Sequence, residues 1–170
     1  MNIILIGPMG CGKTTTGPIL ADRLGMTYLA VDKEAQKKVG VTTTNQIKEK
    51  FGVERYRELL TEIISFLSGA DGVVVDCGEG IVELGPDKER LLKEAGKVVF
   101  LSARPEILWD RIKGSAERVR WLSKQGDPFE VYKRNFESNR KFYSVADLEV
   151  DTSGLTQEEV AESVINKLKG

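Results

Sequence analysis

The stretch that decides the fold is Gly7-Pro8-Met9-Gly10-Cys11-Gly12-Lys13-Thr14, which fits the phosphate-binding pattern G-x-x-x-x-G-K-[ST]. The run that precedes it, residues 2–6, is apolar and rich in β-branched side chains, which predicts a buried parallel strand. The segment that follows, residues 15–24, has the apolar spacing of a helix, with Gly25 as its expected end. Strand, glycine loop and helix in this order predict an anion site, because backbone N–H groups point inward and the helix dipole favours negative charge.

In a loop of this kind the lysine and the hydroxyl residue have separate tasks. We expect Lys13 to reach the β- and γ-phosphates of ATP, and the Thr14 hydroxyl to hold Mg²⁺. The residues of this stretch expected around the ATP phosphates are Gly10, Cys11, Gly12, Lys13, Thr14 and Thr15.

Composition narrows the class of protein. The 170 residues predict a single domain, 1–170, and a net charge of −1 argues against a broad nucleic-acid or membrane surface. Two cysteines do not make a disulfide framework, and no charged leader precedes the first strand, so we expect a cytoplasmic protein. The chain has no histidine, so any catalysis must use carboxylates, lysine, arginine and Mg²⁺.

The rest of the chain alternates between strand and helix patterns. Further strands are expected at 26–31, 73–75, 97–101 and 148–150. The intervening helices are expected at 33–39, 45–51, 54–67, 86–95, 105–112 and 129–143, and a capping box at 156–159 opens the last helix. This order predicts an α/β fold with a doubly wound five-stranded parallel sheet, of the P-loop NTPase and nucleoside-monophosphate-kinase type. Ligands then bind beyond the carboxyl ends of the strands.

Two carboxylates follow predicted strands at that edge. Asp76 ends the run Val73-Val74-Val75-Asp76, a form typical of an acidic residue that orients Mg²⁺ or its water. The alternative is a turn residue before Gly78. Asp32 follows the second strand, where the alternative is an N-cap for the next helix.

Arginines are concentrated in the second half of the chain, where a solvated surface position is the better explanation for any one of them taken singly. Arg118 and Arg120 differ because they lie in a polar, basic segment of weak periodicity, 113–127. We interpret this segment as a mobile lid that closes over the nucleotide phosphates and excludes water. Its arginine would stabilise the phosphoryl group during transfer.

These features together resemble the shikimate kinase family of small P-loop kinases, almost from end to end. The resemblance implies that Asp32 binds the substrate hydroxyl and acts as the base, within a substrate-binding segment 32–60. The segment Gly52-Val53-Glu54-Arg55-Tyr56-Arg57 matches the family's G-E-x-x-F-R, so Arg57 is expected to grip the substrate carboxylate. The same resemblance implies that the turn formed by Gly78, Glu79 and Gly80 contacts the substrate, and that Arg140 is the second arginine that binds the substrate carboxylate. It also implies that Arg111 lies near the adenine and that either Arg118 or Arg120 is the lid arginine.

The chain also departs from the family pattern. Ala30 replaces the family aspartate that supports Mg²⁺ through water, and Leu60 replaces the glutamate that follows the substrate arginine. The lid proline is replaced by Trp121 or, in the other alignment, by Val119. We hypothesise that metal support has moved to Asp76. The middle glycine of the triple-glycine turn is Glu79, whose side chain could neutralise the positive site, contact further hydroxyls or a cation, or point to solvent.

The sequence therefore predicts an ATP- and Mg²⁺-dependent kinase acting on a hydroxyl of a small polar metabolite. The two arginines favour a carboxylate-bearing acceptor, for which shikimate is the best named candidate, in aromatic amino acid biosynthesis. The alternatives are another acceptor, such as a sugar acid, a modified sugar or a nucleoside monophosphate, and a regulatory NTPase without an acceptor. We expect a monomer whose partners are ATP and the acceptor, with no nucleic acid and no membrane.

Overall fold

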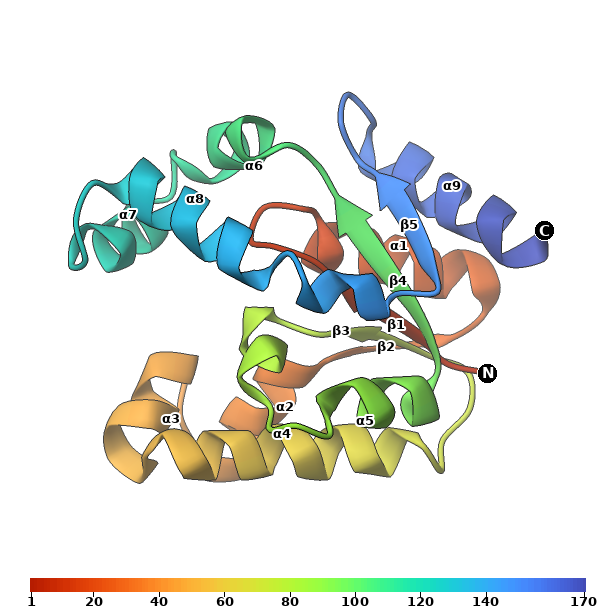
Figure 1. Cartoon of the computed structure of the whole chain (residues 1–170). Coiled ribbons are helices and arrows are strands. Elements are labelled where there is room, and N and C mark those ends of the chain that lie inside the picture. The colour runs from red at the N-terminus through yellow and green to blue at the C-terminus, as the bar shows by residue number, and fades with distance from the viewer.

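A five-stranded parallel sheet forms the centre of the fold, with the strand order β2-β3-β1-β4-β5 (Figure 1). The computed structural model describes residues 1–170, and all four strand pairs run parallel. The strands are β1 Ile3–Ile6, β2 Thr27–Ala30, β3 Val73–Asp76, β4 Lys97–Ser102 and β5 Leu148–Asp151. The predicted α/β class, the five strands and their parallel pairing are confirmed.

Helices cover both faces of this sheet. The α-helices are α1 Lys13–Leu24, α2 Val31–Val39, α3 Thr44–Phe51, α4 Val53–Leu67, α5 Lys88–Ala95, α6 Pro105–Ile112, α7 Ala116–Ser123, α8 Pro128–Asn139 and α9 Gln157–Lys169. Two short 3₁₀ helices, η1 Glu79–Glu83 and η2 Phe142–Val145, complete the fold. In Figure 1, α2, α4 and α5 lie below the sheet, whereas α1 and α9 lie on its other side.

The alternation of side chains along β1 explains why there are two cores. Ile4 and Ile6 belong to the cluster that packs on α4, whereas Ile3 and Leu5 belong to the cluster that packs on α1 and α9. All four side chains are at most 1% exposed. A strand buried on both faces needs a continuous apolar run, which is the pattern that precedes the phosphate loop.

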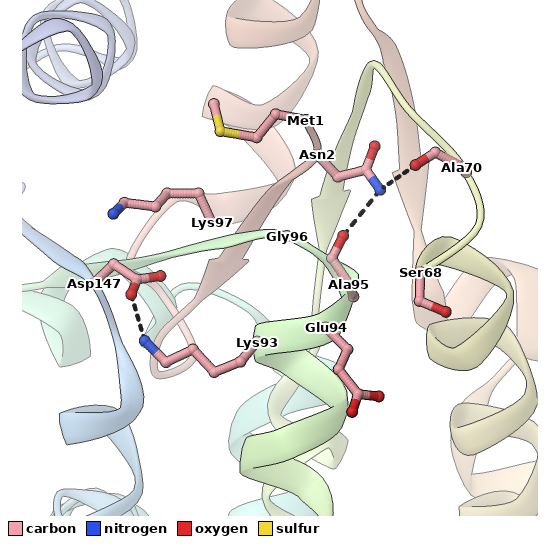
Figure 2. Close-up of a pocket in the computed structure, with 10 residues that line it drawn as sticks. All are labelled: Met1, Asn2, Ser68, Ala70, Lys93, Glu94, Ala95, Gly96, Lys97 and Asp147. Carbon is pink, nitrogen blue, oxygen red and sulfur yellow. Dashed lines mark hydrogen bonds and ion pairs between the residues drawn. The ribbon is translucent and has the colours of Figure 1, made fainter.

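Asn2 fastens the amino ends of the strands. Its buried side-chain amide donates to the carbonyl oxygens of Ala70 and Ala95 (Figure 2). The same amide donates to the carbonyl oxygen of Leu67, and Oδ1 accepts from the N–H of Val73. The pocket drawn there shares no residue with the predicted site, which lies at the opposite ends of the strands.

Some predicted boundaries were wrong. The second helix begins at Val31, not 33, so Asp32 lies inside α2 and is not its N-cap. The segment 113–127 contains the regular helix α7, and the helix predicted over 129–143 ends at Asn139 before η2. The capping box of Thr156 and Glu159 is confirmed. No helix is long and apolar enough to cross a bilayer.

Candidate active site

The phosphate loop joins β1 to α1 with a backbone that only glycine adopts readily. Gly10 and Gly12 have φ values of 89° and 97°, in the left-handed region. Lys13 is buried and donates from Nζ to the carbonyl oxygen of Gly7 at 2.7 Å. Burial by itself would lower the pKa of Lys13, but its neighbours, among them Asp76, more than offset this, so the pKa is raised and the side chain stays cationic.

Asp76 lies beside the residue predicted to hold the metal. The Thr14 hydroxyl donates to Asp76 Oδ2 at 2.8 Å, and the Tyr28 hydroxyl donates to the same oxygen at 3.1 Å. Asp76 is 5% exposed, at the end of β3, and its partner in the neighbouring strand is Ala30. The Asp76 side chain accepts a hydrogen bond from the Thr14 hydroxyl of the phosphate loop, a contact that the alternative role as a simple turn residue does not require. The residue that replaces the family aspartate, Ala30, therefore stands directly beside a carboxylate at the same register.

The donors here suit Mg²⁺. A threonine hydroxyl and a carboxylate are hard oxygen ligands, and Mg²⁺ takes one or two protein oxygens and completes its shell with water and phosphate. Asp76 Oδ2 already accepts two hydrogen bonds, whereas its Oδ1 accepts none. The residues present thus fit a metal whose direct ligand is Thr14 and whose water is oriented by Asp76.

Asp32 is held by Tyr56 from below the sheet. Tyr56, 1% exposed on α4, donates its hydroxyl to Asp32 Oδ1 at 3.0 Å. The second oxygen, Oδ2, lies over Gly78, where any Cβ would collide with it, and a Cβ on Gly80 would collide with the Tyr56 hydroxyl. Both glycines of this turn are therefore required by the carboxylate and the phenol that pack on them.

Burial is the main reason that the pKa of Asp32 is raised, and the nearby Asp76 adds to the rise. The hydrogen bond from Tyr56, Lys13 and Lys48 act in the opposite direction. Lys48 Nζ lies 4.9 Å from the centroid of the Tyr56 ring and 2.6 Å from Glu83, so the phenol is fixed on its other side as well. A carboxylate with a raised pKa beside a phosphate loop is suited to accept a proton from a hydroxyl.

Glu79 points to the phosphate loop, not to solvent. Its Oε1 accepts a hydrogen bond from the backbone N–H of Met9 at 2.9 Å, and the carbonyl oxygen of Met9 accepts one from the Tyr132 hydroxyl at 2.7 Å. The alternative that the Glu79 side chain points to solvent is therefore wrong. The backbone of Met9 is therefore hydrogen-bonded to the β3 turn through its N–H and to α8 through its carbonyl oxygen.

Arg111 joins the phosphate loop to the segment after β5. Its guanidinium donates to the carbonyl oxygen of Gly10 at 3.3 Å, and to the hydroxyl and carbonyl oxygens of Thr152 at 2.9 and 2.7 Å. Thr152 in turn donates to the carbonyl oxygen of Ser102. Arg111 thus lies on the flank of the loop opposite Asp32, which suits a position near the base of the nucleotide.

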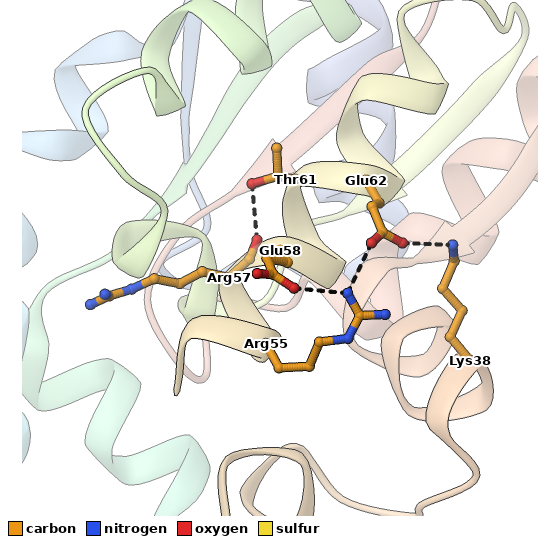
Figure 3. A network of polar contacts seen from close by, with 6 residues as sticks. All are labelled: Lys38, Arg55, Arg57, Glu58, Thr61 and Glu62. Atoms are coloured by element: carbon orange, nitrogen blue, oxygen red, sulfur yellow. Dashed lines mark hydrogen bonds and ion pairs between the residues drawn. The ribbon is translucent and has the colours of Figure 1, made fainter. Parts of the chain in front are cut away.

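The two arginines expected at the acceptor carboxylate do not touch the centre described so far. Arg57 Nη1 pairs with Glu54 at 2.5 Å, and Arg57 Nε is buried without a hydrogen-bond partner. Figure 3 shows Arg57 extending away from the surface ion pairs that link Arg55 to its neighbours on α4. Arg140 is 76% exposed and lies 4.0 Å from Glu137. Their role stays a prediction.

Helix geometry separates the two lid arginines. Positions two apart on a helix differ by about 200°, so Arg118 and Arg120 point in nearly opposite directions. Leu122, 1% exposed, is four residues after Arg118 and shares its face. Arg118 is also close enough to Tyr132 to lower its pKa, against the effect of burial, which raises it. Both arginines are exposed, and Arg118 is the one on the side of α7 that carries Leu122.

Several residues of this centre were not predicted as site residues. Tyr56 fitted the apolar face of α4, and its hydroxyl contact depends on α2 lying across that helix. Tyr28 and Tyr132 likewise act through hydroxyl groups that no local pattern reveals. The one available signal was the phenylalanine position of the family segment, which is occupied by Tyr56.

Together, the phosphate loop, the strand-end carboxylates and the arginine-bearing helix beyond β4 define a small P-loop kinase. The shikimate kinase family model matches residues 9–169. A shikimate kinase of Geobacter sulfurreducens is 39% identical over 96% of this chain and 88% of its own length. A shikimate kinase structure from Aquifex aeolicus has a TM-score of 0.84 and 35% identity, covering 100% of this chain and 97% of its own. One from Acinetobacter baumannii, in complex with shikimate, has a TM-score of 0.87 and 28% identity, covering 99% and 92%. The chain belongs to the shikimate kinase family, as the sequence indicated.

Proposed function

We propose that this protein transfers the γ-phosphoryl group of ATP to a hydroxyl of shikimate, as a cytoplasmic enzyme of aromatic amino acid biosynthesis. The observation that carries the proposal is the buried Asp32 carboxylate, held by Tyr56 over the glycine turn at the same edge of the sheet as Lys13. Family membership supports shikimate as the acceptor. A nucleotide switch has no need of this carboxylate.

The residues around the loop divide the work of phosphoryl transfer. The N–H groups from Gly10 to Thr15 and the dipole of α1 bind the phosphates, and Lys13 neutralises charge on the transferred group. Asp32 orients the acceptor hydroxyl and takes its proton through Oδ2, because Oδ1 is held by Tyr56. Arg118 supplies a positive charge from the lid, with Arg120 as the alternative, and Arg111 borders the nucleotide.

Mg²⁺ would be held by the Thr14 hydroxyl, with Asp76 orienting its water. When bound, it supplies positive charge to the β- and γ-phosphate oxygens. We assign metal support to Asp76 on the strength of its contact with Thr14 and its register beside Ala30.

The acceptor pocket lies between the turn 78–80 and the segment 32–60. Arg57 and Arg140 are proposed to bind the acceptor carboxylate. The buried, unpartnered Nε of Arg57 supports this assignment, since its other nitrogens pair only with an exposed glutamate. For Arg140 to take part, it must leave the solvent-exposed position that it has here.

An acceptor screen tests the function. ADP release is measured with shikimate, with a sugar acid, with a nucleoside monophosphate and without acceptor. We expect ATP turnover to be stimulated by shikimate above the other compounds, and Asp32→Asn to abolish that stimulation. Turnover that no acceptor changes would instead identify a regulatory NTPase.

A further inference from the structure

Glu79 is the one residue of the β3 turn that contacts both halves of the site. Its backbone lies between Gly78 and Gly80, which pack on the Asp32 carboxylate and the Tyr56 hydroxyl. Its side chain leaves the turn and reaches Met9 in the phosphate loop, 70 residues away in sequence. The family pattern has glycine at this position, and a glycine has no side chain that could make this contact with the loop.

Both backbone polar groups of Met9 are hydrogen-bonded. The N–H, in the peptide that joins Pro8 to Met9, donates to Glu79 Oε1 at 2.9 Å, and the carbonyl oxygen, in the peptide that joins Met9 to Gly10, accepts from Tyr132 at 2.7 Å. Tyr132 is 3% exposed on α8, so it is a rigid partner. A shift of the β3 turn therefore acts on the first of these peptides through Glu79, while the second stays bound to α8.

We propose that Glu79 is a positioning residue that couples the acceptor turn to the phosphate loop, so that acceptor and nucleotide strengthen each other's binding. The inference rests on the proposed function, because it takes the turn 78–80 as part of the acceptor pocket. Binding of the acceptor orders the turn, and the hydrogen bond between the Glu79 carboxylate and the Met9 N–H then orders the phosphate loop as well. Coupling of this kind is reciprocal, and each ligand changes the affinity of the other by the same factor.

The charge of Glu79 is not what the coupling requires. The contact with Met9 is a hydrogen bond to an oxygen, which a glutamine carbonyl also provides, whereas glycine and alanine provide none. Comparing these three substitutions separates the hydrogen bond from the negative charge near Lys13. Glu89 offers a control: it is an exposed carboxylate in the first turn of α5 and takes no part in the site.

The experiment measures the dissociation constant of Mg·ADP by calorimetry, with and without saturating shikimate. We expect at least about fivefold tighter Mg·ADP binding with shikimate in the wild type. The factor should fall to near one in Glu79→Gly and Glu79→Ala, and should be retained in Glu79→Gln and Glu89→Gln. Thermal unfolding identifies any variant that fails to fold, and two variants without the oxygen keep the comparison intact.

The outcomes distinguish this inference from the proposed function. If the wild type binds shikimate but shows no coupling, or if Glu79→Gly and Glu79→Ala keep the wild-type factor, the role of Glu79 is refuted and the kinase activity stands. If Glu79→Gln loses the coupling together with the other two, the hydrogen bond is not its basis. If the wild type does not bind shikimate, the proposed acceptor is wrong and the coupling fails with it.

Discussion

Replacing Tyr56 with phenylalanine removes one hydroxyl and leaves the ring in its place against Lys48. That hydroxyl donates to Asp32 Oδ1 at 3.0 Å, and it stabilises the ionised carboxylate more than the protonated one. Hydrogen bonds contribute about 1.5–3 kcal/mol to a charged partner and about 0.5–1.5 kcal/mol to a neutral one, so the difference is roughly 1–1.5 kcal/mol. Ionising Asp32 becomes harder by a factor of roughly 5 to 12.

The consequence is a pH profile that moves in one direction. The Tyr56 bond lowers the pKa of Asp32, against the burial that raises it, so Tyr56→Phe raises this pKa further. The acid limb of kcat/KM for the acceptor should move to higher pH, with roughly 5- to 12-fold lower kcat/KM on the limb and little change on the plateau. The assay is steady-state ADP release across the pH range at saturating Mg·ATP.

Tyr143 provides the control. It is also a buried tyrosine, stacked on Phe100 with ring centroids 4.6 Å apart, but its hydroxyl has no hydrogen-bond partner. Tyr143→Phe should therefore leave the acid limb where it is. An unmoved limb in Tyr56→Phe, or an equal displacement in both variants, would refute the assignment of Asp32 as the group that titrates.

Four further substitutions test the metal, the base and the lid. Asp76→Asn should weaken the apparent affinity for Mg²⁺ by about 10- to 100-fold, measured by titrating the activity with Mg²⁺. An unchanged titration would mean that Asp76 does not support the metal and that Thr14 alone holds it. Asp32→Asn should lower turnover by about 10²- to 10⁴-fold. Folding raises the pKa of Asp32, so the stability of the wild type falls as the pH rises from the unfolded-state pKa through the folded-state pKa. The melting temperature of the variant should therefore exceed that of the wild type by a margin that grows toward neutral pH. Arg118→Ala should lower kcat by about 100-fold or more, whereas Arg120→Ala has a much smaller effect, and the reverse order in rapid-quench measurements would assign the role to the outer face of α7.

The features that the sequence predicts well are those that depend on residues close together in the chain. The loop from Gly7 to Thr14 depends on glycine conformations and a helix start, and the buried strands depend on short apolar runs; both are local. The helix over 116–123 was missed because its buried residues are few, and much of what holds it is packing of α7 against α8.

The contacts that set the chemistry are of another kind. Tyr56 and Asp32 are 24 residues apart, and Glu79 and Met9 are 70 apart, so each contact exists only once the sheet has assembled. A two-residue difference in where α2 begins also changed the interpretation of Asp32, from an N-cap to a side chain facing the site. Sequence identifies the residue types, and tertiary packing decides which atom of each is free to react.

The register pair of Ala30 and Asp76 gives the metal-support position two possible strands. Neighbouring strands are about 4.8 Å apart, so a carboxylate at either position reaches nearly the same point in space. The register of the sheet, and not the identity of one strand, therefore sets where a carboxylate can orient the water of a metal held by Thr14.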